Sequence, residues 1–306
     1  MFDTIDEIQS AMEAAQYITD RPTATVMYLS LKLEKPILVE GEAGVGKTEM
    51  AKVLSQVLGT RLIRLQCYEG LDVNTALYEW NYPKQILYMK QVEICQGASS
   101  GMGKEIFGPE FLIRRPLLEA IQDEAEQPPV LLIDEIDRSD EEFEAFLLEV
   151  LSDFQITIPE IGTIQAKKRP RVILTSNRTR ELHDALKRRC LYHWIDYPSL
   201  EKERRIVQAK VPGIGEVLLQ QVCLFMQRVR EKEFYKRPGI AETLDWALAL
   251  IALGKEELDP MVVRETLGCI FKYREDMRQM EEAGLDQLLN RLPSRDDLMR
   301  PQIPCA

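Results

Sequence analysis

The sequence predicts an α/β fold, in which a five-stranded parallel sheet with helices on both faces is followed by a small all-helical domain. Three observations predict this fold. Before Pro198, short β-branched apolar runs alternate with longer amphipathic stretches. One strand-like run leads directly into the glycine-rich segment GEAGVGKT, and a helical pattern follows it. After Pro198 the strand signals stop, and only helical patterns remain.

Five runs are predicted to form the sheet. Several are almost continuously apolar, which is typical of parallel strands buried on both faces. The predicted strands are residues 36–40, 61–67, 130–134, 171–176 and 191–197. Residues 155–158 and 163–166, which flank the segment PEIG, are predicted to pair as a β-hairpin.

The helical patterns define the domains. Residues 47–58 and 140–153 are predicted helices of the α/β domain, and the second has one apolar face that should pack on the sheet. Four helices are expected at residues 200–210, 215–233, 240–253 and 260–280. We therefore predict an α/β domain at residues 1–198, a helical domain at 199–285 and an irregular tail at 286–306.

Residues 68–112 fit neither pattern. They connect a predicted strand to a predicted helix, yet they are much longer than a usual connection and include QGASSGMGKEIFG. Long segments of this kind inside a compact domain are often functional. We interpret residues 68–112 as an insertion with a functional surface.

The composition limits the class of protein. The 306 residues are 45% hydrophobic and 29% charged, with a net charge of −11, which is typical of a globular protein. The pI near 5.0 and the lack of a Lys/Arg cluster argue against a nucleic-acid partner. The longest apolar stretch, residues 246–253, is too short for a transmembrane segment. Six scattered cysteines without a C-x-x-C pair and the absence of an export signal favour reduced thiols in a cytoplasmic protein.

The segment GEAGVGKT satisfies the pattern G-x-x-x-x-G-K-T between a strand and a helix. In this context the backbone amides of a glycine turn and of a helix N-terminus converge on one point and can bind phosphate. Lys47 would reach the β- and γ-phosphates of ATP, and the Thr48 hydroxyl would bind Mg²⁺. The predicted nucleotide-binding residues are Gly41, Glu42, Ala43, Gly44, Val45, Gly46, Lys47, Thr48 and Glu49.

The segment VLLIDEID places two carboxylates at the end of a predicted buried strand. The carboxyl edge of a parallel sheet is where ligands of open α/β folds bind. Asp134 would hold Mg²⁺, through water, and Glu135 would polarise a water molecule that attacks the γ-phosphate. This pair therefore predicts ATP hydrolysis.

Three further side chains are candidates for catalysis. Asn177 ends the predicted strand RVILTSN and would orient the attacking water, or it caps the strand end. Arg188 and Arg189 precede the last strand and would stabilise the charge on the transferring phosphoryl group, or they are solvated surface charges.

In the order of these elements, residues 20–250 resemble AAA+ ATPases of the MoxR type. The resemblance rests on GEAGVGKT as Walker A, LLIDE as Walker B, TSN as sensor 1 and KRRCLYHWIDYP as the arginine-finger region. The long segment after the second strand, ITIPEIGTI and RPGIAETLDWALAL look MoxR-like. YEGLDVNTALYEWNYPKQIL and RRCLYHWIDYPSLEKERRIV resemble the subgroup associated with maturation of carbon monoxide dehydrogenase and related molybdenum enzymes.

The resemblance implies a homohexameric ring with ATP at the subunit interfaces, where Arg189, with or without Arg188, reaches the neighbour's nucleotide. It also implies a von Willebrand A domain partner and a chaperone activity. The chaperone would remodel a metalloenzyme client, such as carbon monoxide dehydrogenase or a related molybdenum hydroxylase, during insertion of its cofactor. The insertion at 68–112 would face the pore or the client, with Phe107 either a contact point or part of the local packing.

The sequence departs from the wider family at sensor 2. The corresponding region reads KRPGIAE, where Arg237 is the nearby cation that could reach the nucleotide. The alternative function is an ATP-dependent regulatory switch or assembly scaffold without mechanical remodelling. A GTPase is disfavoured because no guanine-reading N-K-x-D segment occurs.

Overall fold

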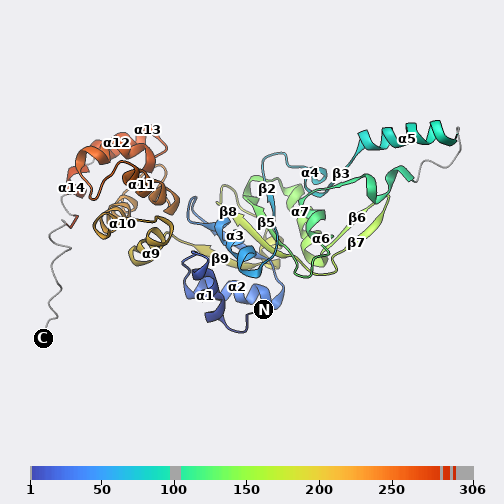
Figure 1. Ribbon diagram of the computed structural model, residues 1–306, viewed down its shortest axis with the longest axis horizontal. Coiled ribbons are helices and arrows are strands. Elements are labelled where there is room, and N and C mark those ends of the chain that lie inside the picture. Colours follow the sequence, from blue (N-terminus) through green and yellow to red (C-terminus); the bar gives the residue numbers. More distant parts are fainter. Residues whose placement is uncertain (1, 97–104, 283–284, 290–291, 294–306) are drawn as a thin grey trace. The chain divides into compact units, whose positions relative to one another are not determined.

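The computed structural model describes residues 2–96, 105–282, 285–289 and 292–293. The chain divides into two compact units, whose elements are labelled in Figure 1. Unit 1 contains residues 1–15, 19–41 and 47–194, and unit 2 contains residues 16–18, 42–46 and 195–306. The predicted boundary at residue 199 lies close to residue 195, where the long segment of unit 2 begins. The sequence did not predict that residues 42–46, from the glycine-rich loop, would group with the helical unit.

Unit 1 is built on a parallel sheet with the strand order β2-β5-β8-β1-β9. Leu38 of β1 pairs with Leu174 of β8, and Leu132 of β5 pairs with Ile173 of β8. The five-stranded sheet and the α/β fold class are therefore confirmed. The strands are β1 (Ile37–Gly41), β2 (Leu62–Gln66), β5 (Val130–Asp134), β8 (Arg171–Ser176) and β9 (Leu191–Ile195).

The helices of unit 1 pack on this sheet and on one another. Helices α2 and α3 contact β1, whereas α6 contacts β2 and β5. The helices are α1 (Ile5–Ala14), α2 (Arg21–Leu33), α3 (Lys47–Leu58), α6 (Pro116–Ile121), α7 (Glu141–Asp153) and α8 (Asp184–Arg189). Helix α3 has the predicted bounds, and α7 begins one residue later than predicted because Asp140 is its N-cap and accepts a hydrogen bond from the Phe143 amide.

The insertion at 68–112 is mostly regular structure rather than a long loop. Strand β3 (Tyr78–Trp80) pairs antiparallel with β4 (Leu112–Arg114), and α5 (Tyr82–Gln96) extends away from this ribbon (Figure 1). The other elements are α4 (Val73–Leu77) and the 3-10 turns η1 (Glu105–Phe107) and η2 (Pro109–Phe111). Residues 97–104 of the glycine-rich stretch lie outside the described residues.

Aromatic side chains explain why the insertion folds. Trp80 and Phe111 are buried in the main hydrophobic cluster of unit 1. The ring of Phe107 lies 5.2 Å from that of Trp80 in an edge-to-face contact, a favourable arrangement for aromatic pairs. Phe107 thus takes part in local packing, which was one of its two predicted roles.

The predicted hairpin is confirmed as β6 (Gln155–Ile158) and β7 (Gly162–Gln165), with Ile156 opposite Ile164. Its turn lies near strand β3. Burial raises the pKa of the Tyr78 hydroxyl, and the negative charge of Glu160 raises it further. The two ribbons, β3–β4 and β6–β7, therefore lie side by side at one end of unit 1 (Figure 1).

Unit 2 is helical in its described part. Its helices are α9 (Leu200–Lys210), α10 (Glu216–Arg230), α11 (Ile240–Ala252), α12 (Pro260–Ile270), α13 (Arg274–Glu282) and α14 (Leu285–Leu289). The single helix predicted at 260–280 is wrong. Phe271 leaves the helical conformation (φ −105°, ψ 139°), and its ring packs 4.8 Å from Phe234, so the chain turns between α12 and α13.

The start of the predicted irregular tail is also wrong. Residues 285–289 are helical, because Leu285 and Leu288 are buried in the core of unit 2. Residues 294–306 of the predicted tail lie outside the described residues. Among the residues that the structure describes, no helix is both long and apolar enough to cross a membrane.

Three cysteines lie in protected positions. Burial raises the pKa of the thiols of Cys67, Cys190 and Cys223 to about 12. A thiol with such a pKa is protonated near neutral pH and is therefore a poor nucleophile. These three residues fit the structural role that their scattered spacing predicts.

A buried ion pair stabilises unit 2. Two guanidinium nitrogens of Arg230 lie 2.6 and 2.8 Å from the carboxylate oxygens of Glu203, and both side chains are at least 94% buried. Arg230→Met should lower the free energy of unfolding by about 3–5 kcal/mol, because the buried Glu203 carboxylate would lose its positively charged partner and keep only the neutral donors Gln227 and Thr243. Urea denaturation checks this value. The double variant Glu203→Leu/Arg230→Met should be closer to wild type, and an equal loss in both variants would contradict the argument.

Candidate phosphate-binding and catalytic site

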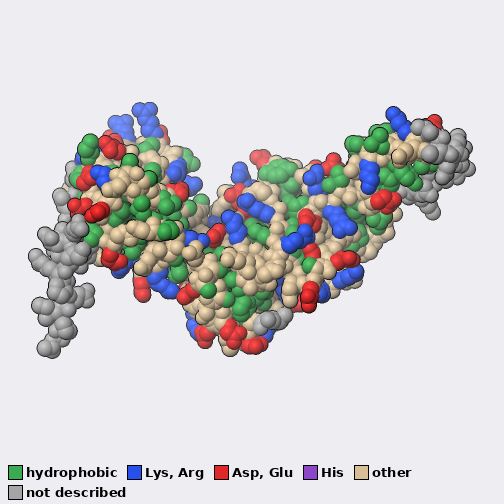
Figure 2. All heavy atoms as spheres, viewed as in Figure 1, with side chains coloured by type: hydrophobic (Ala, Val, Ile, Leu, Met, Phe, Trp, Pro, Cys, Tyr) green, Lys and Arg blue, Asp and Glu red, His purple; other side chains and the backbone are tan. Residues whose placement is uncertain are grey.

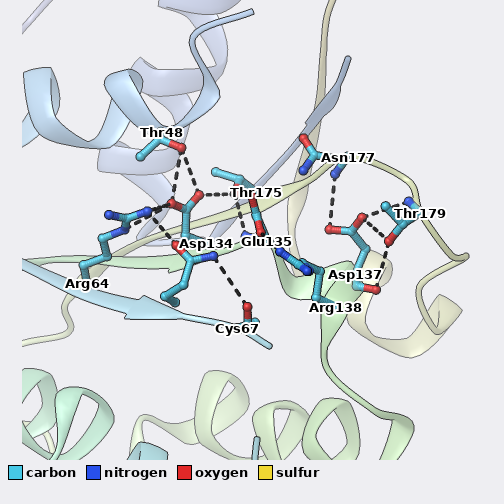
Figure 3. A network of polar contacts seen from close by, with 11 residues as sticks. Thr48, Arg64, Cys67, Asp134, Glu135, Asp137, Arg138, Thr175, Asn177 and Thr179 are labelled. Carbon is cyan, nitrogen blue, oxygen red and sulfur yellow. Dashed lines mark hydrogen bonds and ion pairs between the residues drawn. The ribbon is translucent and has the colours of Figure 1, made fainter. Parts of the chain in front are cut away.

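The strand order brings the predicted site residues of unit 1 to one edge of the sheet. Strand β8 lies between β5 and β1, so the carboxyl ends of these three strands are neighbours. The ends of β5, β8 and β1 carry Asp134, Asn177 and Gly41, respectively. Figure 3 shows Thr48 of α3 beside Asp134 at this edge, with Glu135 and Asn177 close by. The sheet thus assembles side chains that lie far apart in the sequence.

The glycine-rich loop has backbone conformations that require glycine. Gly44 and Gly46 have φ values of 77° and 96°, in the left-handed region that other residues rarely adopt. Lys47 is buried as the first residue of α3, and its Nζ donates a hydrogen bond to the Gly41 carbonyl at 2.8 Å. This hydrogen bond joins the first residue of the loop to the first residue of α3, so two residues of the motif hold the ends of the loop together.

In unit 2, the loop packs against the N-terminus of α11. The Gly44 carbonyl accepts a hydrogen bond from the Ala241 amide at 3.1 Å. A Cβ atom on Gly239 would lie only 2.7 Å from the carbonyl oxygen of Ala43. The Gly239 amide is itself fixed, because it donates to the Glu242 carboxylate at 2.8 Å. Residue 239 must consequently be glycine for the loop to keep this conformation.

We expect Gly239→Ala to weaken ATP binding at least about tenfold, since a close clash of this kind costs on the order of 1–3 kcal/mol and displaces the loop. Titration with a fluorescent ATP analogue measures the effect, and a thermal melt checks the fold. Gly268→Ala is the matched control: this glycine lies in α12, and apart from its chain neighbours and the nearby backbone of its own helix, no described atom falls within 4 Å of an added Cβ. Equal affinities for the two variants would contradict the assignment.

Asp134 is the most heavily bonded carboxylate at the sheet edge. It is 2% exposed, and its Oδ1 accepts hydrogen bonds from the hydroxyls of Thr48 at 3.0 Å and Thr175 at 2.6 Å. Its Oδ2 accepts from Arg64, whose Nη2 is 2.6 Å away and whose Nε is 3.1 Å away (Figure 3). Three side chains from α3, β8 and β2 therefore orient this carboxylate.

The pair of Thr48 and Asp134 fits Mg²⁺. A hydroxyl and a carboxylate are hard oxygen donors, and Thr48 can donate its proton to Asp134 while its lone pair faces a metal ion. The described residues contain no cluster of three or more His, Cys, Asp or Glu side chains that could hold a metal. One hydroxyl and one carboxylate are typical protein ligands of Mg²⁺ that is bound together with phosphates and water.

Glu135 has a constrained backbone and an accessible carboxylate. Its φ of 55° and ψ of 50° are left-handed, and its amide donates to the Thr175 hydroxyl at 2.9 Å. Since Thr175 also donates to Asp134, one hydroxyl positions both acidic residues. The Glu135 side chain is 33% exposed, and its Oε2 lies 3.1 Å from Nη1 of Arg138. A water molecule can therefore reach this carboxylate, as a general base requires.

Asp137 fixes the segment that carries Asn177. Its buried carboxylate accepts hydrogen bonds from the amides of Asn177 at 3.2 Å and Thr179 at 2.8 Å, and from the Thr179 hydroxyl at 2.7 Å. The side-chain amide of Asn177 makes no hydrogen bond to another described residue. The backbone is thus fixed while the Asn177 amide stays available for a ligand.

The two candidate arginines lie in the last turn of α8 and differ in their contacts. Nε of Arg189 donates to the Ser152 hydroxyl of α7 at 2.6 Å, and Nη1 donates to the Ala185 carbonyl at 3.1 Å. Arg188 is exposed and has no hydrogen bond or ion pair within the described chain. Arg180 further ties the segment before α8 to the start of α7, through the carbonyl of Ser139, just before the helix, and the buried carboxylate of Glu144 within it.

Arg237 belongs to unit 2, whereas the residues of Figure 3 belong to unit 1. Its side chain is exposed, and its carbonyl accepts a hydrogen bond from the Tyr197 hydroxyl at 3.4 Å. Both partners of this hydrogen bond lie in the helical unit. The role of Arg237 at the nucleotide stays a prediction.

Sequence reasoning missed Arg64, Thr175 and Asp137. Arg64 was detectable as the one charged residue inside the apolar run LIRLQ, and Asp137 as the third acidic residue of DEID. Thr175 is the first residue of the segment TSN, but its contact with the acidic residues was not predicted, since a threonine in a buried strand is common. Its role depends on the register of β5 and β8, which the sequence alone does not specify.

The comparisons with known proteins agree with this fold. A family model described as AAA domain (dynein-related subfamily) matches residues 36–190, about half of the chain. An uncharacterized protein of Staphylococcus epidermidis is 26% identical over 257 residues, covering 82% of this chain and 88% of its own length. An uncharacterized protein of Staphylococcus aureus is 26% identical over 205 residues, covering 65% and 69%, respectively.

Solved structures of the Thermotoga maritima protein RuvB also align with the chain. A point mutant of RuvB has a TM-score of 0.48 and 17% identity over 97% of this chain and 85% of its own. A second RuvB structure, described as a Holliday junction branch migration motor, has a TM-score of 0.45 and 16% identity over 95% and 84%.

Proposed function

Because this chain belongs to the AAA domain family of the dynein-related subfamily, and hence to the AAA+ ATPases, we propose that it hydrolyses ATP to ADP and phosphate at the sheet edge of unit 1. The observation that supports this most strongly is the shared hydroxyl of Thr175, which positions Asp134 and Glu135 together beside Thr48. The end of strand β5 thus supplies both carboxylates, that of Asp134 for Mg²⁺ and that of Glu135 for the attacking water.

Each residue has a defined task in this proposal. The loop amides and Lys47 bind the β- and γ-phosphates, while Thr48 and Asp134 hold Mg²⁺. When bound, Mg²⁺ would neutralise the charge on the phosphate oxygens. Glu135 accepts a proton from the attacking water, and the free amide of Asn177 orients that water.

The proposed use of ATP is mechanical. We infer that the protein is a MoxR-type chaperone that works as a hexameric ring with a von Willebrand A domain partner. Its client would be a metalloenzyme during cofactor insertion, such as carbon monoxide dehydrogenase or a related molybdenum hydroxylase. The support is the MoxR-like sequence of the insertion, of the β6–β7 hairpin and of residues 237–250, which include most of α11, together with the folded β3–β4 ribbon.

The first test measures the mass of the oligomer that the Glu135→Gln variant forms with ATP and Mg²⁺. This variant is used because it should bind ATP without hydrolysing it. A nucleotide-dependent hexamer supports the ring and justifies affinity capture of a von Willebrand A domain partner. Client structure is then probed with ATP and with a non-hydrolysable analogue. A remodelling protein should stall with the analogue, whereas full function with the analogue would instead support the switch.

A further inference from the structure

Arg64 lies at the proposed metal site without a role in the proposed reaction. The alternation of strand β2 buries Ile63 and Leu65, so Arg64 lies on the opposite, exposed side of the strand. From there its guanidinium reaches along the sheet to Asp134, at the end of the neighbouring strand β5 (Figure 3). Figure 2 shows that Asp and Glu side chains are distributed over the visible surface, so carboxylates other than the buried Asp134 are common on this protein.

The contact is close and specific. Two nitrogens of Arg64 lie 2.6 and 3.1 Å from the same oxygen of Asp134, Oδ2, and the Asp134 side chain is only 3% exposed. The same Nη2 also donates to the Gln66 side chain at 2.5 Å, which holds the guanidinium in place. Oδ1 accepts hydrogen bonds from the hydroxyls of Thr48 and Thr175, which are neutral. The positive charge that compensates the carboxylate is therefore that of Arg64, which lies at Oδ2.

The second acidic residue is compensated in the same way. Glu135 lies 3.1 Å from Arg138, and buried Lys47 adds another positive charge. A third carboxylate, Asp137, is nearby, but it accepts two backbone amides and a hydroxyl. At this edge of the sheet, three carboxylates thus face the three positive charges of Arg64, Arg138 and Lys47, so little net negative charge is left to attract a free dication. These charges suit Mg²⁺ bound to ATP, because the ATP phosphates carry negative charge of their own.

We propose that Arg64 is a positioning residue that makes Mg²⁺ binding at Thr48 and Asp134 depend on nucleotide. Its fixed positive charge compensates Asp134 and repels a free dication, and the phosphates of ATP supply the missing negative charge. This inference rests on the proposed function, because it assumes the same metal site. A metal that enters only with ATP keeps the site from filling with free Mg²⁺ before the substrate arrives.

The experiment measures Mn²⁺ binding by electron paramagnetic resonance, without nucleotide and with a non-hydrolysable ATP analogue. A unit charge and a dication about 6 Å apart repel each other enough to change affinity about tenfold, even at the dielectric constant of water. Arg64→Gln should therefore bind free Mn²⁺ at least about tenfold more tightly than wild type. Arg64→Lys keeps the charge and should remain near wild type.

Two controls assign the effect to the pair. Arg61→Gln removes an arginine just before the same strand, one that pairs with Asp123 and Glu119 instead, and should leave Mn²⁺ affinity unchanged. Asp134→Asn in the Arg64→Gln background should abolish the gain. An Arg64→Gln affinity equal to or weaker than wild type overturns the inference. The proposed function fails separately, if wild-type protein binds the ATP analogue but takes up no Mn²⁺ with it.

Discussion

Replacing Glu135 with glutamine should lower the rate of ATP hydrolysis about a hundredfold or more, while ATP binding stays close to wild type. The glutamine keeps the size of the side chain and can still accept a hydrogen bond from Arg138, but it cannot take a proton from water. Steady-state phosphate release gives the rate, and equilibrium titration with a fluorescent ATP analogue gives the affinity.

Glu149→Gln is the matched control, because Glu149 is an exposed glutamate of α7 and has no hydrogen bond or ion pair within the described chain. It should hydrolyse ATP like the wild type. If Glu135→Gln hydrolysed ATP as fast as Glu149→Gln, Glu135 would not be the residue that accepts a proton from the attacking water. Loss of ATP binding in Glu135→Gln would instead indicate that the variant disturbs the neighbouring Asp134.

Arg188→Ala should reduce turnover by roughly a thousandfold if Arg188 reaches the nucleotide of a neighbouring subunit, because arginine fingers contribute effects of this size. We favour Arg188 over Arg189 because Arg189 is already bonded to Ser152 and Ala185, whereas Arg188 is free within the described chain. Arg189→Ala should then have the smaller effect on turnover. Its expected loss of stability is below about 1 kcal/mol, since its contacts are exposed.

Mixing subunits separates action in trans from action within one subunit. Neither Arg188→Ala nor Glu135→Gln should turn over ATP alone, but a mixture pairs an intact finger with an intact Glu135 at some interfaces. Partial activity in the mixture, measured over a range of ratios, is the expected result. Inactivity at every ratio would contradict a finger that acts across an interface, and a larger loss in Arg189→Ala would reverse the assignment of the two arginines.

The sheet of unit 1 was predictable because its strands have a strong local signal. Strands β5 and β8 match the predicted residues, and β1, β2 and β9 differ only at their ends. Helices α1 and α2 were not predicted. Their N-caps Thr4 and Asp20 are visible in the sequence, but these helices are amphipathic and precede any strand that would show what they pack on.

The candidate site was predictable only in part. The motif residues Lys47, Thr48, Asp134 and Glu135 have fixed spacing along the chain, so their chemistry could be read from local sequence. The partners Arg64 and Thr175 come from neighbouring strands, and their contacts depend on register. The break between α12 and α13 likewise depends on the distant ring of Phe234, a tertiary contact that overrides local helical propensity.

The position of β1 within the sheet has a consequence for synthesis of the chain. Strand β1, which carries the start of the phosphate-binding loop, pairs with β8 and lies next to β9, which are translated about 130 and about 150 residues later, respectively. At roughly 5–20 residues per second, β1 emerges many seconds before its neighbours exist. Its apolar residues Ile37, Leu38 and Val39 are unpaired in that interval. A nascent chain that ends before residue 171 therefore cannot complete the sheet, and ATP cannot stabilise it until β8 has joined.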